Sequence, residues 1–366
     1  MGFRFPIALI SLLASAALPL RAQEARLKAA EEWNLTAPCD GNSAVVWHEG
    51  RLVVFTSDGA TPRVSYASAA GENWETYEIR FTNLRDRTVW IESAWVDASG
   101  AILAWYHHEP WGMYEDSLLT APSIGSAVSH DGGRTFTDLG IVLSSGDPLD
   151  DDAENGYFTG GHGDFTVVPD RERKYFYFLF TNYGGPARRQ GVALARLPFA
   201  DRFEPEGKVV KYFDGEWEEP GVGGRVTPVL PATRAWRHRD PQSFWGPAVH
   251  WNTHLRRHVV LLNRTSGGPR WEQEGVYVSY VSDLADPESW TKPVKLIDAK
   301  ELPGGHTFYP QVIGLERDGS DSLAGRVARF FLHGSSRWEI EFRVTPSSGT
   351  SQPARPIPTD IARPDS

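Results

Sequence analysis

Three acidic residues stand at matching places in the sequence, and carboxyl groups placed in this way could carry out acid–base chemistry. Asp40 in CDGNS, Glu92 in WIESAW and Asp164 in GHGDF each lie where an apolar, strand-like run begins. Cleavage of a glycosidic bond needs one carboxyl group to protonate the leaving oxygen and another to activate water or attack carbon. A third carboxyl group nearby would raise the pKa of the acid by like-charge repulsion. The alternative is that these acids hold a buried ion or accept hydrogen bonds from backbone amides.

A second set of residues could bind a sugar beside these acids. Its members are polar or aromatic side chains near the ends of predicted strands or in Gly-rich loops: His107, Glu109, His162, Arg225, Trp245, Arg270, His306, Tyr309 and Gln311. His107 and Glu109 share one face of an extended strand, because side chains alternate along it. Arg225 and Arg270 could bind a substrate carboxylate or pair with neighbouring acids. Packing or loop structure is the alternative role for the whole set.

The elements that must position these residues are β-strands, because short aromatic and β-branched runs bounded by Gly, Asp, Asn and Pro dominate the chain. Five segments share an apolar strand, a polar turn and a second strand: SAVVWHEGRLVVFTS, SAWVDASGAILAWYH, DFTVVPDRERKYFYFLFTN, PAVHWNTHLRRHVVLLNR and YPQVIGLERDGSDSLAGRVARFFLHG. Further strands follow each of them. This repeat predicts an all-β fold, a five-bladed β-propeller with four-stranded antiparallel blades. The first strand of each blade would line the central axis, so the three acids would converge at one mouth.

The two ends of the chain differ from the rest. Residues 1–22 predict a signal peptide, with Arg4 ahead of an apolar run at 7–20 that is too short to span a bilayer. Residues 25–33, ARLKAAEEW, have a helical composition and predict a short N-terminal cap. Residues 23–345 form the predicted propeller domain, and the Pro/Ser-rich segment 346–366 predicts a disordered tail. We therefore expect a secreted or periplasmic protein.

Composition and missing motifs exclude several classes of protein. The net charge of −10 is a poor match for nucleic acid, and the single cysteine excludes a disulfide framework and Cys-based zinc sites. The chain has no GxSxG, HExxH or P-loop motif. His250, His254 and His258 have helical spacing but bridge two predicted strands, so we expect no metal site there. Asp147 with Asp150–Asp152 could bind a structural calcium or form a solvated acidic loop.

The remaining expectations concern partners and cofactors. We expect a carbohydrate substrate, no nucleic acid partner, no membrane contact after signal cleavage, a monomer, and no cofactor beyond the calcium just mentioned.

Residues 129–136, SHDGGRTF, fit the pattern Ser-x-Asp-x-Gly-x-Thr-aromatic. This pattern resembles the Asp box of sialidase-like propellers. Its Ser and Asp are expected to close a hairpin turn with side-chain to backbone hydrogen bonds, and its Gly to permit the turn. The segment SDLADPESW in the fourth repeat looks like the equivalent turn. Both patterns indicate a fold and not an activity.

Longer stretches resemble the five-bladed glycosidase superfamily that includes family 43 glycoside hydrolases. DGNSAVV followed by GRLVVFTS resembles that family's first blade, WIES the segment that bears its acid, and GGHG its glycine–histidine segment. FWGPA resembles its Trp-Ala-Pro-Asp segment, although this chain has Ala248 where the family has Asp. The resemblance implies Asp40 as the general base, Glu92 as the general acid and inversion at the anomeric carbon. Asp164 would then modulate a pKa or be the alternative acid.

The leading hypothesis is a secreted glycoside hydrolase that acts on a poly- or oligosaccharide. A sialidase-like hydrolase is a second hypothesis, but it needs a tyrosine nucleophile and a cluster of arginines. A third hypothesis, from another class, is a catalytically silent propeller that binds carbohydrate or protein, because a fold does not by itself fix a function.

Overall fold

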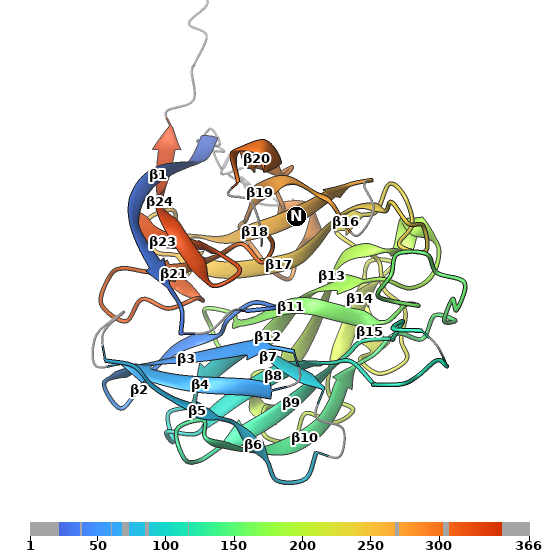
Figure 1. Ribbon diagram of the computed structural model, residues 1–366, viewed down its shortest axis with the longest axis horizontal. Coiled ribbons are helices and arrows are strands. Elements are labelled where there is room, and N and C mark those ends of the chain that lie inside the picture. The colour runs from blue at the N-terminus through green and yellow to red at the C-terminus, as the bar shows by residue number, and fades with distance from the viewer. Residues whose placement is uncertain are drawn as a thin grey trace, which may run out of the picture.

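The computed structural model of the protein is a ring of five β-sheets around a central axis (Figure 1). It describes residues 22–345 apart from 37–38, 60, 68–72, 85–87, 116, 268–270 and 303–306. Nearly all of the predicted signal peptide, the predicted tail, Arg270 and His306 lie outside the described residues. The five-bladed all-β propeller predicted from the sequence is confirmed.

The first three blades follow one another along the chain, and each begins with its innermost strand apart from one short edge strand of the second blade. The first contains β2 (Val45–His48), β3 (Arg51–Asp58), β4 (Thr61–Ala67) and β5 (Glu75–Glu78). The second contains β7 (Val89–Val96), β8 (Ile102–His108), β9 (Ser123–Ser129), β10 (Thr135–Leu143) and, at its outer edge, β6 (Arg80–Phe81). The third contains β11 (His162–Pro169), β12 (Tyr175–Asn182), β13 (Gly191–Pro198), β14 (Val210–Phe213), β15 (Glu216–Pro220) and β16 (Leu230–Pro231).

The last two blades complete the ring. The fourth contains β17 (Gln242–Asn252), β18 (Arg257–Ser266), β19 (Gln273–Val281), β20 (Val294–Asp298) and β22 (Leu323–Ala324). The fifth contains β21 (Gln311–Gly314), β23 (Val327–Leu332), β24 (Ser335–Thr345) and β1 (Ala22–Asn34). The helices in the described residues are single 3-10 turns: η1 (Ala187–Arg189), η2 (Phe199–Asp201), η3 (Pro287–Ser289) and η4 (Ala299–Glu301). No described helix could cross a membrane.

The predicted N-terminal helix is wrong, because residues 25–33 belong to strand β1. This strand pairs antiparallel with β24 from Ala22 opposite Thr345 to Asn34 opposite Ser335. Figure 1 shows β1 in blue beside β24 in red, so the two ends of the domain share one sheet. Helix propensity is a weak preference that tertiary pairing overrides. The hydrogen bonds that close the ring therefore decide the structure of this segment.

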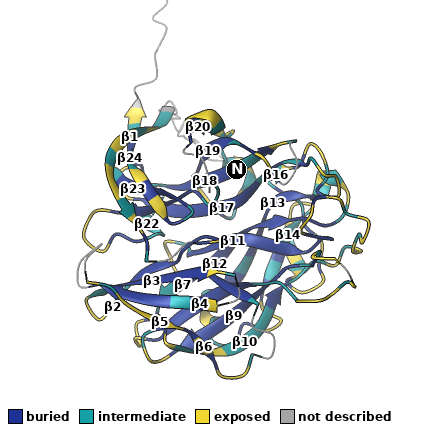
Figure 2. Cartoon of the chain, in the orientation of Figure 1, coloured by how far each residue is buried: buried dark blue, intermediate teal, exposed yellow. Residues whose placement is uncertain are grey.

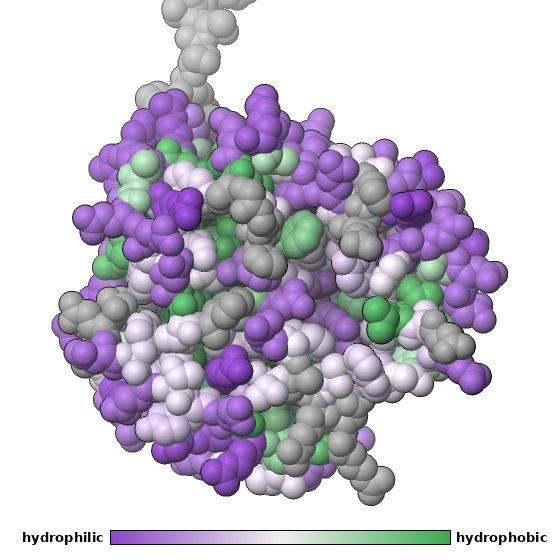
Figure 3. All heavy atoms as spheres, in the orientation of Figure 1, coloured by the Kyte–Doolittle hydropathy of each residue, from purple (hydrophilic) through white to green (hydrophobic). Residues whose placement is uncertain are grey.

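The core lies between neighbouring blades, since both faces of each inner strand are covered. Strand β12, YFYFLFTN, is apolar on both faces and is buried from its second residue to its last. On one face Phe176 packs against Trp105 of the second blade, with ring centroids 5.0 Å apart. Figure 2 shows buried residues along the inner strands and exposed residues on outer strands and loops. Figure 3 shows hydrophilic residues over most of the same face.

The β9–β10 turn is closed by the side chains that the sequence singled out. Ser129 Oγ accepts a hydrogen bond from the Gly133 amide at 2.9 Å. Asp131 Oδ1 accepts hydrogen bonds from the amides of Arg134 and Thr135 at 3.1 and 2.9 Å. These bonds are local to the turn, and none of the five residues lines the axial cavity described next.

Candidate active site

A cavity of about 820 Å³ opens at one end of the axis. All five blades contribute to its lining, and the largest share comes from the connection between β8 and β9. Its acidic lining residues are Asp40, Glu109 and Asp164. Its aromatic lining residues are Trp90, Trp111, Tyr114, Tyr157, Phe158, Trp245, Trp271, Phe308 and Tyr309. Carboxyl groups among aromatic rings suit a ligand that has both hydroxyl groups and apolar faces, as a sugar has.

Glu92 and Asp164 occupy equivalent places on neighbouring blades. The pairing of β7 with β8 shifts register between Ile91 and Ser93, so Glu92 is the extra residue of a β-bulge. The pairing of β11 with β12 shifts in the same way between Gly163 and Phe165, around Asp164. Bulges re-aim side chains and are common beside active sites.

Asp164 faces the cavity from a strained backbone. Its φ is +41°, a left-handed conformation that is uncommon for residues other than glycine. The Tyr183 hydroxyl donates a hydrogen bond to Oδ2. The pKa of Asp164 is raised to about 7, chiefly by burial and also by the nearby Glu92 carboxyl group, while His107 opposes the shift. A cavity-facing carboxyl group with such a pKa can hold a proton near neutral pH and give it to a substrate.

Glu92 lies behind the cavity wall and does not line the cavity. It is 2% exposed, and its Oε2 accepts a hydrogen bond from the Phe165 amide at 2.7 Å. Its Oε1 lies 3.3 Å from His107 Nδ1. Burial raises the pKa of Glu92 to about 8, partly opposed by the hydrogen bond from Phe165. The acid that the sequence favoured is thus turned toward protein atoms, and its carboxyl group is committed to a backbone amide.

Asp40 lines the same cavity and is exposed. Its backbone amide donates to the Ser57 carbonyl at 2.8 Å, which fixes the chain just before β2. The Tyr309 hydroxyl donates to its Oδ1 at 3.4 Å. Burial raises the pKa of Tyr309 well above its usual range, so the phenol keeps its proton and acts as a donor. The next residue, Gly41, passes so close to Glu92 that a Cβ there would lie 3.0 Å from Oε1. Asp40, Glu92 and Asp164 therefore gather at the same end of the axis.

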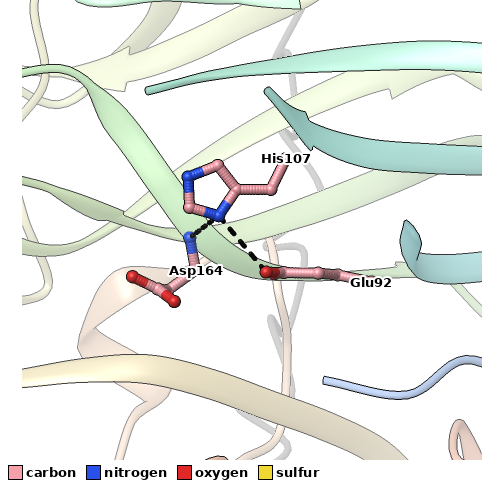
Figure 4. Close-up of side chains that lie close together, drawn as sticks. All are labelled: Glu92, His107 and Asp164. Carbon is pink, nitrogen blue, oxygen red and sulfur yellow. Dashed lines mark hydrogen bonds and ion pairs between the residues drawn. The ribbon is translucent and has the colours of Figure 1, made fainter. Parts of the chain in front are cut away.

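His107 joins the two neighbouring blades. The Asp164 backbone amide donates a hydrogen bond to its Nδ1 at 3.4 Å. Figure 4 shows Nδ1 directed at this amide and at Glu92, while the Asp164 carboxyl group turns away from the ring. Nε2 lies 3.4 Å from Oε1 of Glu109 on the cavity side. Burial raises the pKa of Glu109 to about 7, although His107 opposes the shift. Glu109 is thus a second protonatable group in the cavity.

The donor atoms of Glu92, His107 and Asp164 lie within 4.8 Å of one another, a spacing that could hold a metal ion. However, the Asp164 amide already points at the His107 Nδ1 lone pair, and Phe165 and Tyr183 donate to the two carboxyl groups. The donor geometry therefore fits proton sharing better than metal binding. In the acidic loop, the oxygens of Asp150–Asp152 also lie within 4.8 Å of one another, on partly or fully exposed residues.

Part of the strained backbone lies at the cavity. Of the non-glycine residues with positive φ, Asp164, Trp271 and Tyr309 line it, with φ of 41°, 58° and 56°. Such conformations cost free energy, and they persist where the surrounding structure enforces them, often at functional sites. The aromatic floor is also tightly packed, since Trp245 and Trp271 meet edge to face with centroids 4.9 Å apart.

Three residues expected to contact substrate lie away from the cavity lining. His162 is fully buried, and its Nε2 accepts a hydrogen bond from Lys211 Nζ at 3.0 Å. Gln311 exchanges hydrogen bonds with the backbone of Ser43, at 2.6 and 2.9 Å, and so joins the fifth blade to the first. Arg225 pairs with Glu219, with Nε 2.9 Å from Oε1, at the outer hairpin of the third blade. In the structure these three side chains contact protein atoms outside the cavity lining. Arg270 and His306 stay predictions.

The other expected residues and several unexpected ones do line the cavity. His107, Glu109, Trp245 and Tyr309 are brought together as predicted. Trp271, which follows a strand of the fourth repeat and was not expected, lines the cavity. Tyr183, also not expected, does not line the cavity but donates a hydrogen bond to the lining residue Asp164. Tyr183 directly follows β12, and its position one residue past a strand end near the axis was the signal that could have identified it.

Comparisons with known proteins agree with the fold. A scan with protein-family models gives no match, and a search of curated protein sequences gives none either. Among solved structures, the chain is similar to an inulosucrase from Halalkalicoccus jeotgali bound to kestose. The identity is 16% and the TM-score 0.51, over 88% of this chain and 78% of that one. An α-L-arabinofuranosidase from Lactobacillus brevis matches with 14% identity and a TM-score of 0.50, over 88% and 96%. At these identities the similarity is one of fold.

Proposed function

We propose that this protein is a glycoside hydrolase whose general base is Asp40 and whose general acid is Asp164. The observation that carries the proposal is a pair of cavity carboxyl groups in contrasting surroundings. Asp164 is buried and has a pKa raised to about 7, whereas Asp40 is exposed to solvent. Environments that separate two carboxyl groups in this way assign the acid and the base. Both structural neighbours reported above bear the names of carbohydrate-active enzymes, which supports the same class.

The proposed mechanism is direct displacement by water. Asp164 protonates the oxygen of the scissile bond while Asp40 takes a proton from the attacking water, which inverts the anomeric carbon. Tyr309 holds the Asp40 carboxyl group in place through its hydroxyl, and Tyr183 does the same for Asp164. Glu109, which is also protonatable, is the rival acid.

A neutral saccharide is the proposed substrate class. Among the described residues that line the cavity, every formally charged side chain apart from His107 is acidic, and none is Lys or Arg. A uronic or sialic acid would meet repulsion there. The sialidase-like hypothesis also needs an ionised tyrosine nucleophile, and burial raises the pKa of Tyr309 instead. We further propose that the chain is exported, on the strength of its N-terminal sequence alone.

The test is sugar release from arabinan, galactan, inulin and a wider set of neutral and acidic glycans. We expect release by the wild type from a neutral glycan, and loss of that release in Asp40→Asn. Proton NMR should show the inverted anomer as the first product. Release confined to acidic glycans, or unchanged release by Asp40→Asn, would contradict the proposal. No release at all, together with glycan binding, would favour a silent binding propeller.

A further inference from the structure

The rim of the cavity carries large apolar side chains that solvent reaches freely. Trp111 is 79% exposed, Leu118 81% and Tyr157 46%, and all three line the cavity. Single exposed apolar residues are ordinary on a protein surface. A cluster that continues into a ligand cavity instead marks a binding surface.

Hydrogen bonds join the two connections that carry the exposed aromatic residues of the rim. Trp111 belongs to the connection between β8 and β9, and Tyr157 to the connection between β10 and β11. Thr120 ties the two together: its hydroxyl donates to the Pro110 carbonyl at 2.9 Å, and its amide donates to the Tyr157 carbonyl at 2.9 Å. The Tyr114 hydroxyl adds a bond to Thr159 Oγ1 at 3.3 Å. Thr120 thus joins the backbone beside Trp111 to the backbone of Tyr157.

Tyr157 also connects the rim to the buried floor. Its ring meets Trp271 edge to face, with centroids 5.1 Å apart, and Trp271 is 6% exposed. An aromatic surface therefore runs from the floor, beside the carboxyl groups, up to Tyr157 at the rim. A sugar unit held against Asp40 and Asp164 would leave its neighbour in the chain at this rim. The apolar face of a sugar ring fits an aromatic ring, and its hydroxyl groups would stay in water.

We infer that Trp111 and Tyr157 form a stacking platform for a second sugar unit, next to the unit cleaved at the axis. The inference rests on the proposed function and makes the substrate a chain of neutral sugars. Trp111 then acts in binding and specificity, not in bond cleavage. Because the backbone beside both residues is already held by hydrogen bonds, it loses little conformational freedom when the saccharide binds.

The experiment separates the platform from catalysis by measuring binding in the full-length Asp40→Asn protein. Affinity electrophoresis in gels that contain arabinan, galactan or inulin reports retardation by each polysaccharide. Trp111→Ala and Trp111→Leu, added to this background, should weaken the apparent affinity about tenfold, the scale of one good aromatic contact. Trp111→Phe should restore most of it. Val294→Ala, at a residue that is 63% exposed on β20 and outside the cavity lining, is the matched control and should change nothing.

The outcomes distinguish the platform from the proposed function. Equal retardation of Trp111→Ala and its parent, or no retardation by any of the three polysaccharides, would overturn the platform. Weakened retardation by Trp111→Ala without sugar release by the wild type would support the platform and contradict the hydrolase. An equal loss in Trp111→Phe and Trp111→Ala would also overturn stacking, because a phenyl ring retains an aromatic face.

Discussion

Glu92 on the second blade and Asp164 on the third are both bulge residues near the cavity end of an innermost strand, yet their surroundings differ. At Asp164 the backbone takes a positive φ and the carboxyl group faces the cavity, where a tyrosine hydroxyl is its donor. At Glu92 φ is not positive, and the carboxyl group reaches across to the Phe165 amide on the next blade. Although the two residues occupy equivalent places in the repeat, Asp164 is a candidate catalytic acid and Glu92 is a carboxyl group that bonds to the protein backbone.

This difference teaches that a raised pKa does not by itself identify a catalytic residue. Burial raises the pKa of Glu92 to about 8 and that of Asp164 to about 7. Perturbed pKa values also occur in structural networks. Access to the cavity separates the two residues, and substitutions at each can break or sharpen the comparison.

The largest expected effect is that of Asp164→Asn. The amide keeps the size of the side chain but cannot donate the proton that the leaving oxygen needs. We expect kcat/KM on the responsive glycan to fall by about 10²–10⁴-fold, the usual contribution of general acid catalysis. Circular dichroism should show an unchanged fold. A loss of less than about threefold would move the role of acid to Glu109, and Glu109→Gln should then show the large loss.

Replacing the carboxyl group by an amide at the equivalent bulge residue, Glu92, should lower kcat/KM far less. In Glu92→Gln the amide oxygen can still accept from Phe165, and the amide NH₂ can face His107. We expect kcat/KM to stay within about tenfold of the wild type, because only positioning and a nearby charge have changed. A fall in kcat/KM as large as that of Asp164→Asn would indicate that Glu92 is the general acid.

The pH dependence should follow the acid in the cavity. Asp164 must be protonated to act, so activity should decrease as the pH rises through about 7, where its carboxyl group ionises. The kcat/KM profile of the wild type measures this alkaline limb. A profile that is flat up to pH 9 would contradict the assignment, since only a group of higher pKa could then supply the proton.

Tyr183→Phe should shift that limb by a smaller amount. The tyrosine hydroxyl donates to Asp164 and so favours its ionised form. Removing this donor should raise the pKa of Asp164 and move the alkaline limb upward by about one pH unit, the equivalent of one net hydrogen bond. Tyr309→Phe, which removes the donor to Asp40, is the matched control and should leave the limb in place. A downward shift in Tyr183→Phe would contradict the described contact.

The last expected effect is on stability and not on activity. The folded protein holds the pKa of Glu92 near 8, above its ordinary value of 4.5, so it favours the protonated form. This contribution is complete below about pH 4.5 and is lost as the pH rises through about 8. Gln cannot ionise, so the Tm of Glu92→Gln relative to the wild type should rise between about pH 5 and pH 8.5. Thermal unfolding of both proteins measures this. A relative Tm that falls over the range would show that the Glu92 carboxylate is favoured in the fold.

The sequence predicted the repeat and its consequence at the axis. Strand-like runs, polar turns and recurring acids were enough to place Asp40, Glu92 and Asp164 at one end of a five-bladed ring. These features are local and periodic, so a single sequence contains them. The helix predicted at 25–33 failed because pairing with β24, more than 300 residues away, decides that segment.

The orientation of each acid could not be predicted for a related reason. It depends on the backbone conformation at a bulge and on donors from other strands, such as the Phe165 amide and the Tyr183 hydroxyl. His162 was expected to contact sugar at the axis. In the structure, Lys211, far along the chain, donates a hydrogen bond to its imidazole. Contacts of this kind appear only once the blades are assembled.

The most direct test of the central claim is the dependence of the Asp164→Asn rate on the leaving group. An acid is needed to expel a sugar, but a 2,4-dinitrophenolate leaves without a proton. With substrates of the sugar that the wild type releases, Asp164→Asn should lose about 10²–10⁴-fold on the saccharide and about tenfold or less on the 2,4-dinitrophenyl glycoside. Glu92→Gln should show no such difference. An equal loss by Asp164→Asn on both substrates, or a selective loss in Glu92→Gln, would contradict the assignment of Asp164 as the acid.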